Sequence, residues 1–284
     1  IRYGLVTVQQ LPLKALELTL EEIPHGMLAE YMLASAACFP AFRPREIEGR
    51  SFIDGGYRDN MPCGLARRMG AEEALCVNVD GVGFTRPAPE GLAVRTIESH
   101  WDLGSILNFD PPTAARNMEL GYWDTLRAFG RVRGSAYALR PEGAAYLEEI
   151  LTGRYRPLMA AAVEGSPALA LAERTALNRF ERCTDPELLP AELAAEEAGV
   201  DPTCLWDGPA FCSAFITGFG RARAEKYRPL FYPGEKADRL GAAAAAAQAA
   251  ARPAELIAAG LFYALTGPAP RIGAALCEPG ETIE

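Results

Sequence analysis

Apolar positions in the first 135 residues fall into short runs that are separated by glycine, proline and charged residues. Runs rich in β-branched and apolar residues predict strands, and an i, i+3, i+4 spacing of apolar residues predicts helices. Strands are predicted at residues 3–8, 15–20, 74–79 and 92–97, the first and third of them buried and the last at a sheet edge. Helices are predicted at residues 27–36 and 111–129.

A hairpin followed by a helix is predicted in the middle of this region. The segment 46–53 reverses direction at Gly49, so a short strand is predicted on either side of it. Asn60 is predicted as the N-cap of a helix with Pro62 in its first turn, and Gly70 as the residue that ends it. Strand, helix and strand then follow one another, an order that is typical of a parallel βαβ crossover and so of an α/β domain.

The pattern changes near residue 135, where strand signals end and Ala, Glu and Leu dominate. We therefore predict two regions, residues 1–135 and residues 136–284, the second mostly α-helical and accessory to the first. The alanine-rich run at residues 242–251 predicts a plain surface helix. The most apolar run, residues 256–265, is too short to cross a bilayer and predicts a core helix.

The charge of the chain argues against one class of partner. The 284 residues carry a formal net charge of −9 and a pI near 5.0, whereas nucleic-acid binding needs a basic face. The same charge argues against electrostatic capture by anionic lipid, although it leaves peripheral contact between an apolar surface and a membrane open. The sequence makes no prediction of the oligomeric state.

Cysteine usage points to a reducing compartment. The seven cysteines are an odd number and no pair has CxxC spacing, so neither a disulfide framework nor a zinc site is predicted. No signal peptide or membrane-spanning run is recognisable, and we predict a cytoplasmic protein. The chain opens with Ile1 rather than Met, inside a strand-like run, and we interpret it as a fragment of a longer protein.

The stretch with the most chemical information is SFIDGGYRDNMP, residues 51–62. Asp54 ends a short apolar run, and burial of that run can hold the carboxylate rigidly and raise its pKa towards that of a general base. Gly55 and Gly56 can adopt positive φ and let another backbone come close. An aspartate followed by glycine also closes ordinary hairpin turns, and these residues alone do not separate the two interpretations.

Three sequence features together resemble the patatin-like phospholipase family. Residues 34–42 read ASAACFPAF, the DGG motif follows at residues 54–56, and an N-x-P helix start follows at residues 60–62. The resemblance covers residues 1–135 and corresponds to the second half of the family's catalytic domain. It implies a partial three-layer α/β domain with a mainly parallel sheet, followed by the mostly helical accessory region at residues 136–284.

The resemblance also implies a mechanism. Family members hydrolyse lipid esters with a Ser-Asp dyad, in which Asp54 would be the base and Gly55 and Gly56 would complete the motif. It implies no cofactor, and a phospholipid, lysophospholipid or neutral lipid ester as substrate. The family's nucleophile lies in GxSxG, and the sequence contains no such motif. We therefore expect the serine and the oxyanion loop to lie upstream of Ile1, and the 284-residue chain alone to be inactive.

Two alternatives from other classes stay open. The first is a catalytically inactive patatin-like scaffold whose helical region binds a partner. The second is a metal-dependent hydrolase built on Asp54, Asp59 and Asp80, although their spacing fits no known metal-binding loop. Otherwise Asp59 is expected to order its loop through bonds to backbone amides, and Asp80 to form a turn.

Other polar residues are interpreted as structural. The chain has two histidines, His25 and His100, and neither lies in a triad context, which favours a dyad over a Ser-His-Asp hydrolase. We interpret both as surface or hydrogen-bonded residues. Ser35 is interpreted as a helix-end residue, because nothing around it forms a nucleophile elbow.

Overall fold

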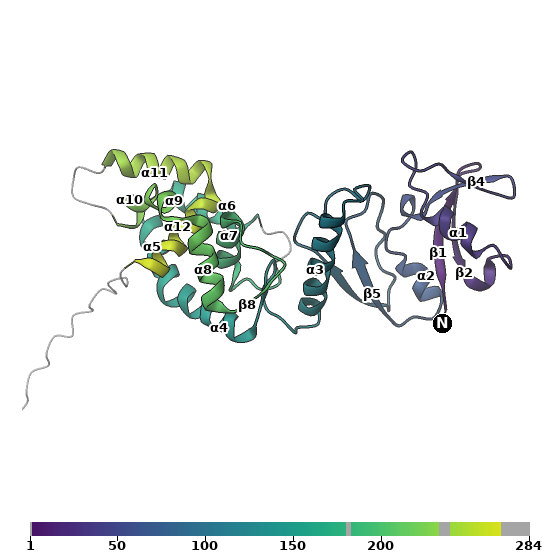
Figure 1. The fold of residues 1–284 in the computed structure, drawn as a ribbon, viewed down its shortest axis with the longest axis horizontal. Helices are drawn as coiled ribbons and strands as arrows, with labels where there is room; N and C mark the ends of the chain where they lie inside the picture. The colour runs from purple at the N-terminus through teal and green to yellow at the C-terminus, as the bar shows by residue number, and fades with distance from the viewer. Residues whose placement is uncertain (1, 180–182, 233–238, 268–284) are drawn as a thin grey trace, which may run out of the picture. The chain divides into compact units, whose positions relative to one another are not determined.

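The structure is a computed structural model, which describes residues 2–179, 183–232 and 239–267 (Figure 1). The chain divides into two compact units, Ile1–Phe129 and Gly130–Glu284. The first unit mixes strands and helices and the second is mostly helical, so the mixed α/β class is confirmed. The assignment of residues 1–135 to the second half of a patatin-like domain, and of residues 136–284 to an accessory region, stays a prediction.

The first unit contains strands, α-helices and short 3-10 helices. In chain order its elements are β1 (Gly4–Gln9), β2 (Lys14–Thr19), η1 (Leu20–Glu22), α1 (Leu28–Ser35), β3 (Arg45–Ile47), β4 (Arg50–Asp54), η2 (Gly55–Tyr57), α2 (Cys63–Arg68), β5 (Glu73–Asn78), β6 (Ala93–Glu98) and α3 (Pro111–Ala128). The predicted strands and the two predicted helices of this region are confirmed, with bounds that differ by a residue or two.

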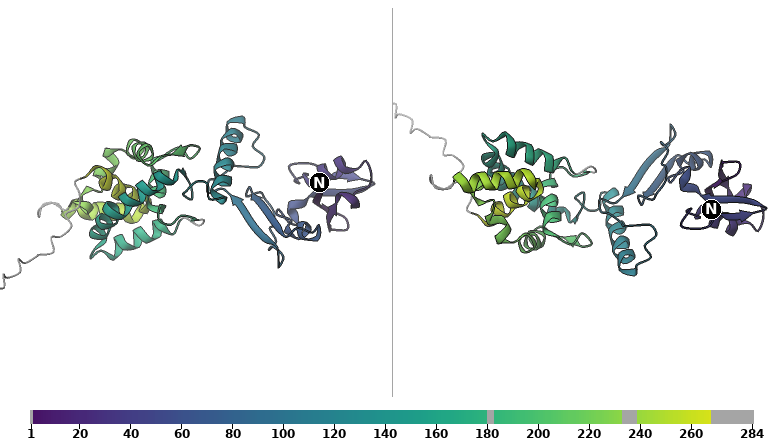
Figure 2. Two further views of the ribbon diagram at one scale, coloured as in Figure 1. Left: turned by 90° about the horizontal axis from the view of Figure 1, so that it is seen from below. Right: turned by 90° about the horizontal axis from the view of Figure 1, so that it is seen from above.

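The N-terminal strands form a four-stranded sheet of order β2-β1-β4-β3, drawn in purple and dark blue in Figure 2. Every neighbouring pair in it is antiparallel. Residues 10–13 join β1 to β2, and Glu48 and Gly49 join β3 to β4, both with positive φ (49° and 73°). Such short connections can join only antiparallel neighbours. The predicted hairpin at Gly49 is therefore confirmed, and the predicted mainly parallel sheet does not hold for these strands.

Helix α1 covers one face of this sheet and packs against β1, β3 and β4. The buried core there consists of Ala34, Ile47 and Phe52. The ring of Tyr31 packs against Phe52 with 5.9 Å between ring centroids. Burial of these side chains stabilises the sheet by removing apolar surface from water, and it fixes β4, whose last residue is Asp54.

Strands β5 and β6 form a separate two-stranded parallel sheet, and α3 packs on β6. The predicted βαβ crossover is therefore wrong, because β4 and β5, which flank α2 in sequence, belong to different sheets. The physical reason is that β4 is hydrogen-bonded to β1 on one side and to β3 on the other, so it offers no edge to β5. The prediction of parallel pairing holds for β5 with β6.

The prediction that β5 is fully buried is wrong. Leu75 and Val77 are 53% and 59% exposed. In the parallel register they lie opposite Arg95 and Ile97, and Arg95 donates a hydrogen bond to the carbonyl of Ala128 at the end of α3. Residues paired across two strands lie on the same face of a sheet, so Leu75 shares a face with Arg95. Helix α3 therefore lies over this face, where it shields β6 from water and leaves the side chains of β5 exposed.

The second unit is built mainly from helices. Its elements are β7 (Ala138–Leu139), α4 (Pro141–Ile150), the π-helix η3 (Leu151–Tyr155), α5 (Arg156–Val163), α6 (Pro167–Leu177), α7 (Leu189–Ala198), β8 (Leu205–Trp206), α8 (Gly208–Phe219), α9 (Arg221–Glu225), α10 (Arg228–Phe231), α11 (Arg239–Ala251) and α12 (Pro253–Thr266). Strands β7 and β8 pair in parallel and tie the start of the unit to α8.

Helix α12 is the centre of the second unit. Its residues 254–264 are all buried, and α6, α7 and η3 pack around it (Figure 1). The predicted core helix at residues 256–265 is therefore confirmed. The alanine-rich helix α11 buries Ala245 and Ala249, one turn apart, and exposes Leu240 to 85%, as a helix on the surface of a core does.

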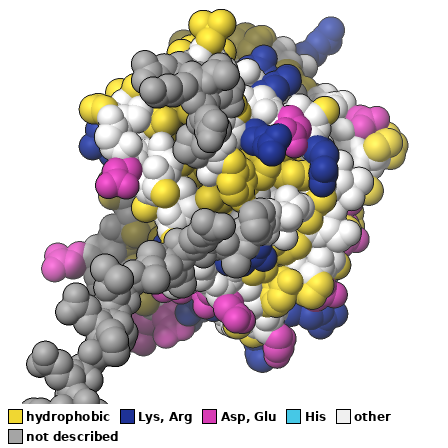
Figure 3. Space-filling model, turned by 90° about the vertical axis from the view of Figure 1, so that its left-hand side faces the viewer, with side chains coloured by type: hydrophobic (Ala, Val, Ile, Leu, Met, Phe, Trp, Pro, Cys, Tyr) yellow, Lys and Arg dark blue, Asp and Glu magenta, His cyan; other side chains and the backbone are white. Residues whose placement is uncertain are grey.

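No helix in the described part of the chain is both long enough and apolar enough to cross a membrane. Figure 3 shows one face of the second unit, where apolar side chains are interspersed with acidic and basic ones.

Candidate active site

Asp54 occupies the end of β4 with its backbone fixed on both sides. Its Cα pairs with Thr7 of β1 in the antiparallel register, and its N–H donates to the carbonyl of Ala37 just after α1 (3.0 Å). The side chain is half-buried. Strand pairing and the contact with the end of α1 thus hold the carboxylate at the point where the chain leaves the sheet.

The two carboxylate oxygens of Asp54 differ in their surroundings. Oδ1 accepts a hydrogen bond from the N–H of Gly56 (2.7 Å), so Asp54 caps the short helix η2. Oδ2 has no hydrogen-bond partner within the described residues. One oxygen therefore orients the carboxylate and the other is available to accept a proton, which is the arrangement that a general base needs.

Close packing explains the two glycines of the motif. A Cβ on Gly55 would lie 2.1 Å from the carbonyl oxygen of Val6, and one on Gly56 would lie 2.2 Å from Oδ1 of Asn60. Any larger residue would collide with these atoms. The expectation of close backbone approach is confirmed, but neither glycine is among the positive-φ residues, so that part of the expectation is wrong.

The loop after the motif is tied to residues 81–86. The N–H of Asn60 donates to the carbonyl of Phe84 (2.6 Å), and the N–H of Phe84 donates to the carbonyl of Gly56 (2.9 Å). The side-chain amide of Asn60 donates to the carbonyl of Gly81 (3.0 Å). Asn60 is therefore not the helix N-cap that the sequence predicts, since α2 begins at Cys63.

Asp59 is buried and orders the same loop. Its Oδ1 accepts hydrogen bonds from the backbone N–H groups of Met61 and Arg86, both at 3.2 Å. This confirms the structural role expected for Asp59. Gly70 follows the C-cap of α2 with φ of 92°, which confirms it as the residue that ends the helix.

Tyr57 is a neighbour of Asp54 that sequence reasoning missed. Its hydroxyl donates a hydrogen bond to the carbonyl of Phe39. Burial raises the pKa of Tyr57, and the nearby Cys38 and Asp54 side chains raise it further. The hydroxyl therefore keeps its proton at neutral pH, and it uses that proton in the hydrogen bond to Phe39. Its position inside the motif, directly after the glycines, is the signal that could have found it.

Ser35 and the two histidines of this unit do not act on Asp54 in the structure. The hydroxyl of Ser35, at the end of α1, donates to the carbonyl of Val6 (2.7 Å), which confirms its structural interpretation. His25 is exposed in a turn, and His100 packs edge-on against Trp101 with 5.4 Å between ring centroids. Neither histidine is a hydrogen-bond partner of Asp54.

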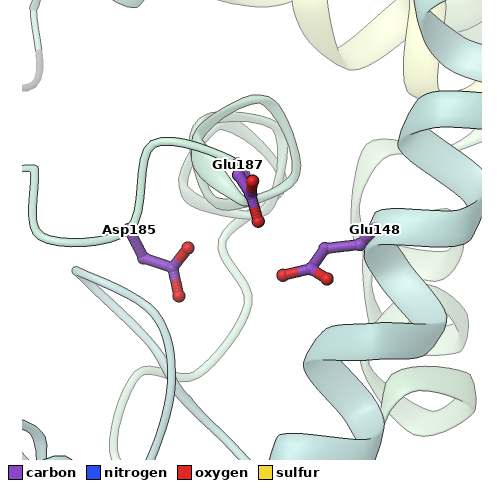
Figure 4. A group of neighbouring side chains, drawn as sticks. All are labelled: Glu148, Asp185 and Glu187. Atoms are coloured by element: carbon purple, nitrogen blue, oxygen red, sulfur yellow. The ribbon is translucent and has the colours of Figure 1, made fainter.

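The acidic residues of the metal alternative do not form a cluster in the described residues. The one group found there that could hold a metal is in the second unit and consists of Glu148, Asp185 and Glu187 (Figure 4). Arg133 bonds Asp185 at 2.7 Å and Glu148 at 2.6 Å, and lies 3.9 Å from Glu187. A guanidinium among the three carboxylates balances their charge, so this group is an ion-pair network that ties the start of the unit to α4 and to the segment before α7.

A hollow of about 290 Å³ lies in the first unit, between the β5–β6 sheet and α3, and Asp54 does not line it. Asp124, a buried residue of α3, does line it. Burial raises the pKa of Asp124, although Arg127 lies 2.6 Å away and opposes the shift. We assign no chemistry to this hollow, because Asp124, Thr113 and Asn117 already bond to Arg127, Asp110 and the Leu103 carbonyl.

Comparison with known families identifies one part of the chain. Residues 10–67 match the model of the patatin-like phospholipase family. No curated protein and no solved structure gives a significant match to the chain. The matched residues include β4, the DGG motif and the first turn of α2, but cover less than the residues 1–135 over which the sequence resembles the family. The segment at residues 10–67, which includes Asp54, is therefore similar to the patatin-like phospholipase family.

Proposed function

We propose that this chain contributes the base of a lipid acyl hydrolase, with Asp54 as the proton acceptor of a Ser-Asp dyad. One observation carries the proposal. Within the segment that matches the patatin-like family, the Asp54 carboxylate is held by the Gly56 amide through Oδ1, and its Oδ2 has no hydrogen-bond partner among the described residues. Gly55 and Gly56 belong to the proposed site, because a Cβ on Gly55 would meet the Val6 carbonyl at 2.1 Å and the N–H of Gly56 holds Oδ1 of Asp54.

The reaction is acyl transfer in two steps. The serine hydroxyl attacks the ester carbonyl while Asp54 accepts its proton, and backbone amides stabilise the oxyanion. The alcohol part of the lipid leaves with that proton. Water then attacks the acyl-enzyme, again with Asp54 as base, and the fatty acid is released. The substrate is a phospholipid, lysophospholipid or neutral lipid ester, and the chemistry requires no cofactor.

The nucleophile in this proposal lies outside the 284 residues. The sequence has no GxSxG. The hydroxyls of Ser35 and Ser51, two serines close to the motif, already donate to the carbonyl of Val6 and to Oε1 of Gln10. The family order places the nucleophile and the oxyanion loop before Ile1. A base without its nucleophile gives no turnover, so the 284-residue chain alone is expected to be inactive.

Peripheral contact with lipid belongs to the same proposal, for a protein that works in the cytoplasm. The loop between β1 and β2 exposes Leu11 to 84% and Leu13 to 78%, next to Lys14. Such a tip can insert apolar side chains at the membrane surface while the lysine stays at the headgroups. Co-sedimentation with phosphatidylcholine vesicles should fall when both leucines are changed to serine.

The decisive test is labelling with a fluorophosphonate, which reacts covalently with activated serines. The 284-residue chain and a version extended upstream in the same reading frame are compared. We expect labelling and ester hydrolysis only in the longer form, with hydrolysis lowered at least about 10³-fold by Asp54→Asn. Asp80→Asn is the matched control, because Asp80 is an exposed acid with φ of 50°, which asparagine also tolerates.

Each outcome decides between the alternatives. Labelling of the short chain would mean that a serine within it is the nucleophile. No labelling of either form would favour the inactive scaffold. Equal loss of hydrolysis in Asp54→Asn and Asp80→Asn, restored by a divalent cation, would favour the metal-dependent hydrolase.

A further inference from the structure

Two cysteines from different elements meet next to the motif loop. Cys63 is the first residue of α2 and Cys76 lies in β5, and their Sγ atoms are 3.3 Å apart. Both are free thiols. Side chains alternate along a strand, so Cys76 lies on the face of β5 opposite Leu75 and Val77. Since Cys76 contacts α2 and the other face is the one that contacts α3, these two helices lie on opposite faces of the β5–β6 sheet.

The geometry favours a covalent bond between the two sulfurs. A disulfide has an S–S distance of about 2.05 Å, so the sulfurs need to approach by little more than an ångström. The backbone around them is already fixed. The loop before α2 is held by the bonds of Asp59 and Asn60 to residues 81–86, and β5 is held along its length by β6.

We propose that Cys63 and Cys76 are an oxidation site, which forms a reversible disulfide when the protein meets a hydroperoxide. In a reducing compartment such a bond forms while an oxidant is present and is then reduced again, so it does not stabilise the fold permanently. The bond would link the start of α2 to β5 and so fix the loop that follows Asp54.

The two sulfurs have different roles in the reaction. Cys76 is partly exposed and Cys63 is 6% exposed, so the oxidant reaches Cys76 first. The hydroperoxide converts the Cys76 thiol to a sulfenic acid and is itself reduced to an alcohol, or to water where it is hydrogen peroxide. The Cys63 sulfur then attacks the Cys76 sulfur. The S–S bond forms, the S–O bond breaks, and the hydroxyl leaves as water with the proton of Cys63.

Burial sets the speed of the second step. It raises the pKa of the Cys63 thiol to about 11, and the neighbouring Cys76 adds to the shift. Since the thiolate is the attacking form, the bond is expected to form slowly at neutral pH and faster at about pH 8.5. This dependence guides the choice of conditions for the test.

The test is mass mapping of the whole 284-residue chain after oxidation. The protein is treated with hydrogen peroxide at about pH 8.5, blocked with N-ethylmaleimide and digested with trypsin without a reductant. We expect a linked pair of peptides, residues 59–67 with residues 69–95, each of which contains one cysteine. Two of the seven thiols should be lost and should return after treatment with dithiothreitol.

Controls make the result decisive. Cys63→Ser and Cys76→Ser should each abolish the linked pair, whereas Cys212→Ser, which removes a buried cysteine of the second unit, should leave it unchanged. The amides of residues 54–62 should exchange hydrogen more slowly in the oxidised protein. The proposal is overturned if Cys76 is recovered as free thiol or sulfinic acid with no linked peptide, under conditions that fully oxidise added glutathione. It is also overturned if Cys76 is linked to another cysteine.

Discussion

The two units of this chain differ in how many of their apolar side chains are exposed to solvent. Among the described residues, 19 of the 22 large hydrophobic side chains that are exposed lie in the first unit and 3 in the second. The buried hydrophobic residues show the reverse, with 14 in the first unit and 38 in the second. The difference is larger than the small difference in length between the units can explain.

The contrast has a structural origin. In the second unit, helices surround α12, so that all of residues 254–264 are buried. In the first unit the strands are divided between a four-stranded and a two-stranded sheet, and each helix covers only part of one face. Because burial of apolar surface is the main stabilising term in folding, the second unit should be the more stable one.

The largest expected effect comes from the core of the second unit. Phe215 of α8 is fully buried and stacks on Phe219 with 5.8 Å between ring centroids. Phe215→Ala should destabilise the unit by about 3–5 kcal/mol, through lost burial and the cavity left behind. Differential scanning calorimetry should show two transitions in the parent chain, of which only the upper one moves in the variant. A single transition that shifts as a whole would mean that the units unfold together.

The second prediction tests the motif of the first unit. Gly55→Ala places a methyl group on the carbonyl of Val6, at 2.1 Å, and backbone there cannot give way cheaply. We expect a loss of roughly 1–3 kcal/mol in the lower transition. Gly64→Ala in α2 is the matched control, since nothing lies within 4 Å of its Cβ, and it should raise stability by up to about 1 kcal/mol. Equal changes in stability for Gly55→Ala and Gly64→Ala would contradict the close approach of η2 to β1.

The third prediction concerns how the stability of the second unit changes at acidic pH. Burial raises the pKa of Glu255, but hydrogen bonds from Tyr227, Arg252 and Gln248 outweigh it and lower the pKa to about 2. The unfolded value is about 4.3. A group with a lowered folded pKa contributes stability that is complete above the unfolded pKa and is lost as pH falls from there towards about 2. The upper transition should therefore lose roughly 1–2 kcal/mol from this group between about pH 6 and pH 3.

Thermal melts at a series of pH values check this prediction. Glu255→Gln should be less stable than the parent at about pH 6 and should lose less stability on acidification. The exposed Glu149→Gln should keep the slope of the parent chain. If the stability of Glu255→Gln falls with pH as steeply as that of the parent chain, then other carboxylates dominate acid unfolding.

Local patterns predicted the strands and most helices of the first unit, and two helices of the second. The hairpin at Gly49, the strand at residues 92–97 and the helix at residues 111–129 follow from glycine, β-branched runs and helical spacing, which act over a few residues. The core helix at residues 256–265 follows from its length and lack of charge. These features depend on neighbours in sequence, so a sequence alone is enough to find them.

Pairing between distant strands could not be predicted in the same way. The order strand, helix, strand favours a parallel crossover, but β4 is bonded on both sides by β1 and β3, and nothing near β4 in sequence reveals its pairing with β1. The exposure of β5 follows from the same partition of strands. At the site, Asp54 and its glycines stood out as a motif, whereas Tyr57 acquires its environment from Phe39 and Cys38, which the fold brings together.

The smallest expected change in stability, at Leu75 of β5, is the most direct test of the contrast between the two units. Leu75 on β5 is 53% exposed, so Leu75→Thr removes little buried surface and puts a β-branched residue, which strands favour, in its place. Its effect on the lower transition should be within about 0.5 kcal/mol, while self-association in sedimentation velocity should fall because an apolar patch becomes polar. Leu65→Thr, at a position only 3% exposed in α2, is the matched control and should cost about 2–4 kcal/mol. If Leu75→Thr is as costly as Leu65→Thr, then the open face of β5 is covered in solution, and the two units are more alike than their described residues suggest.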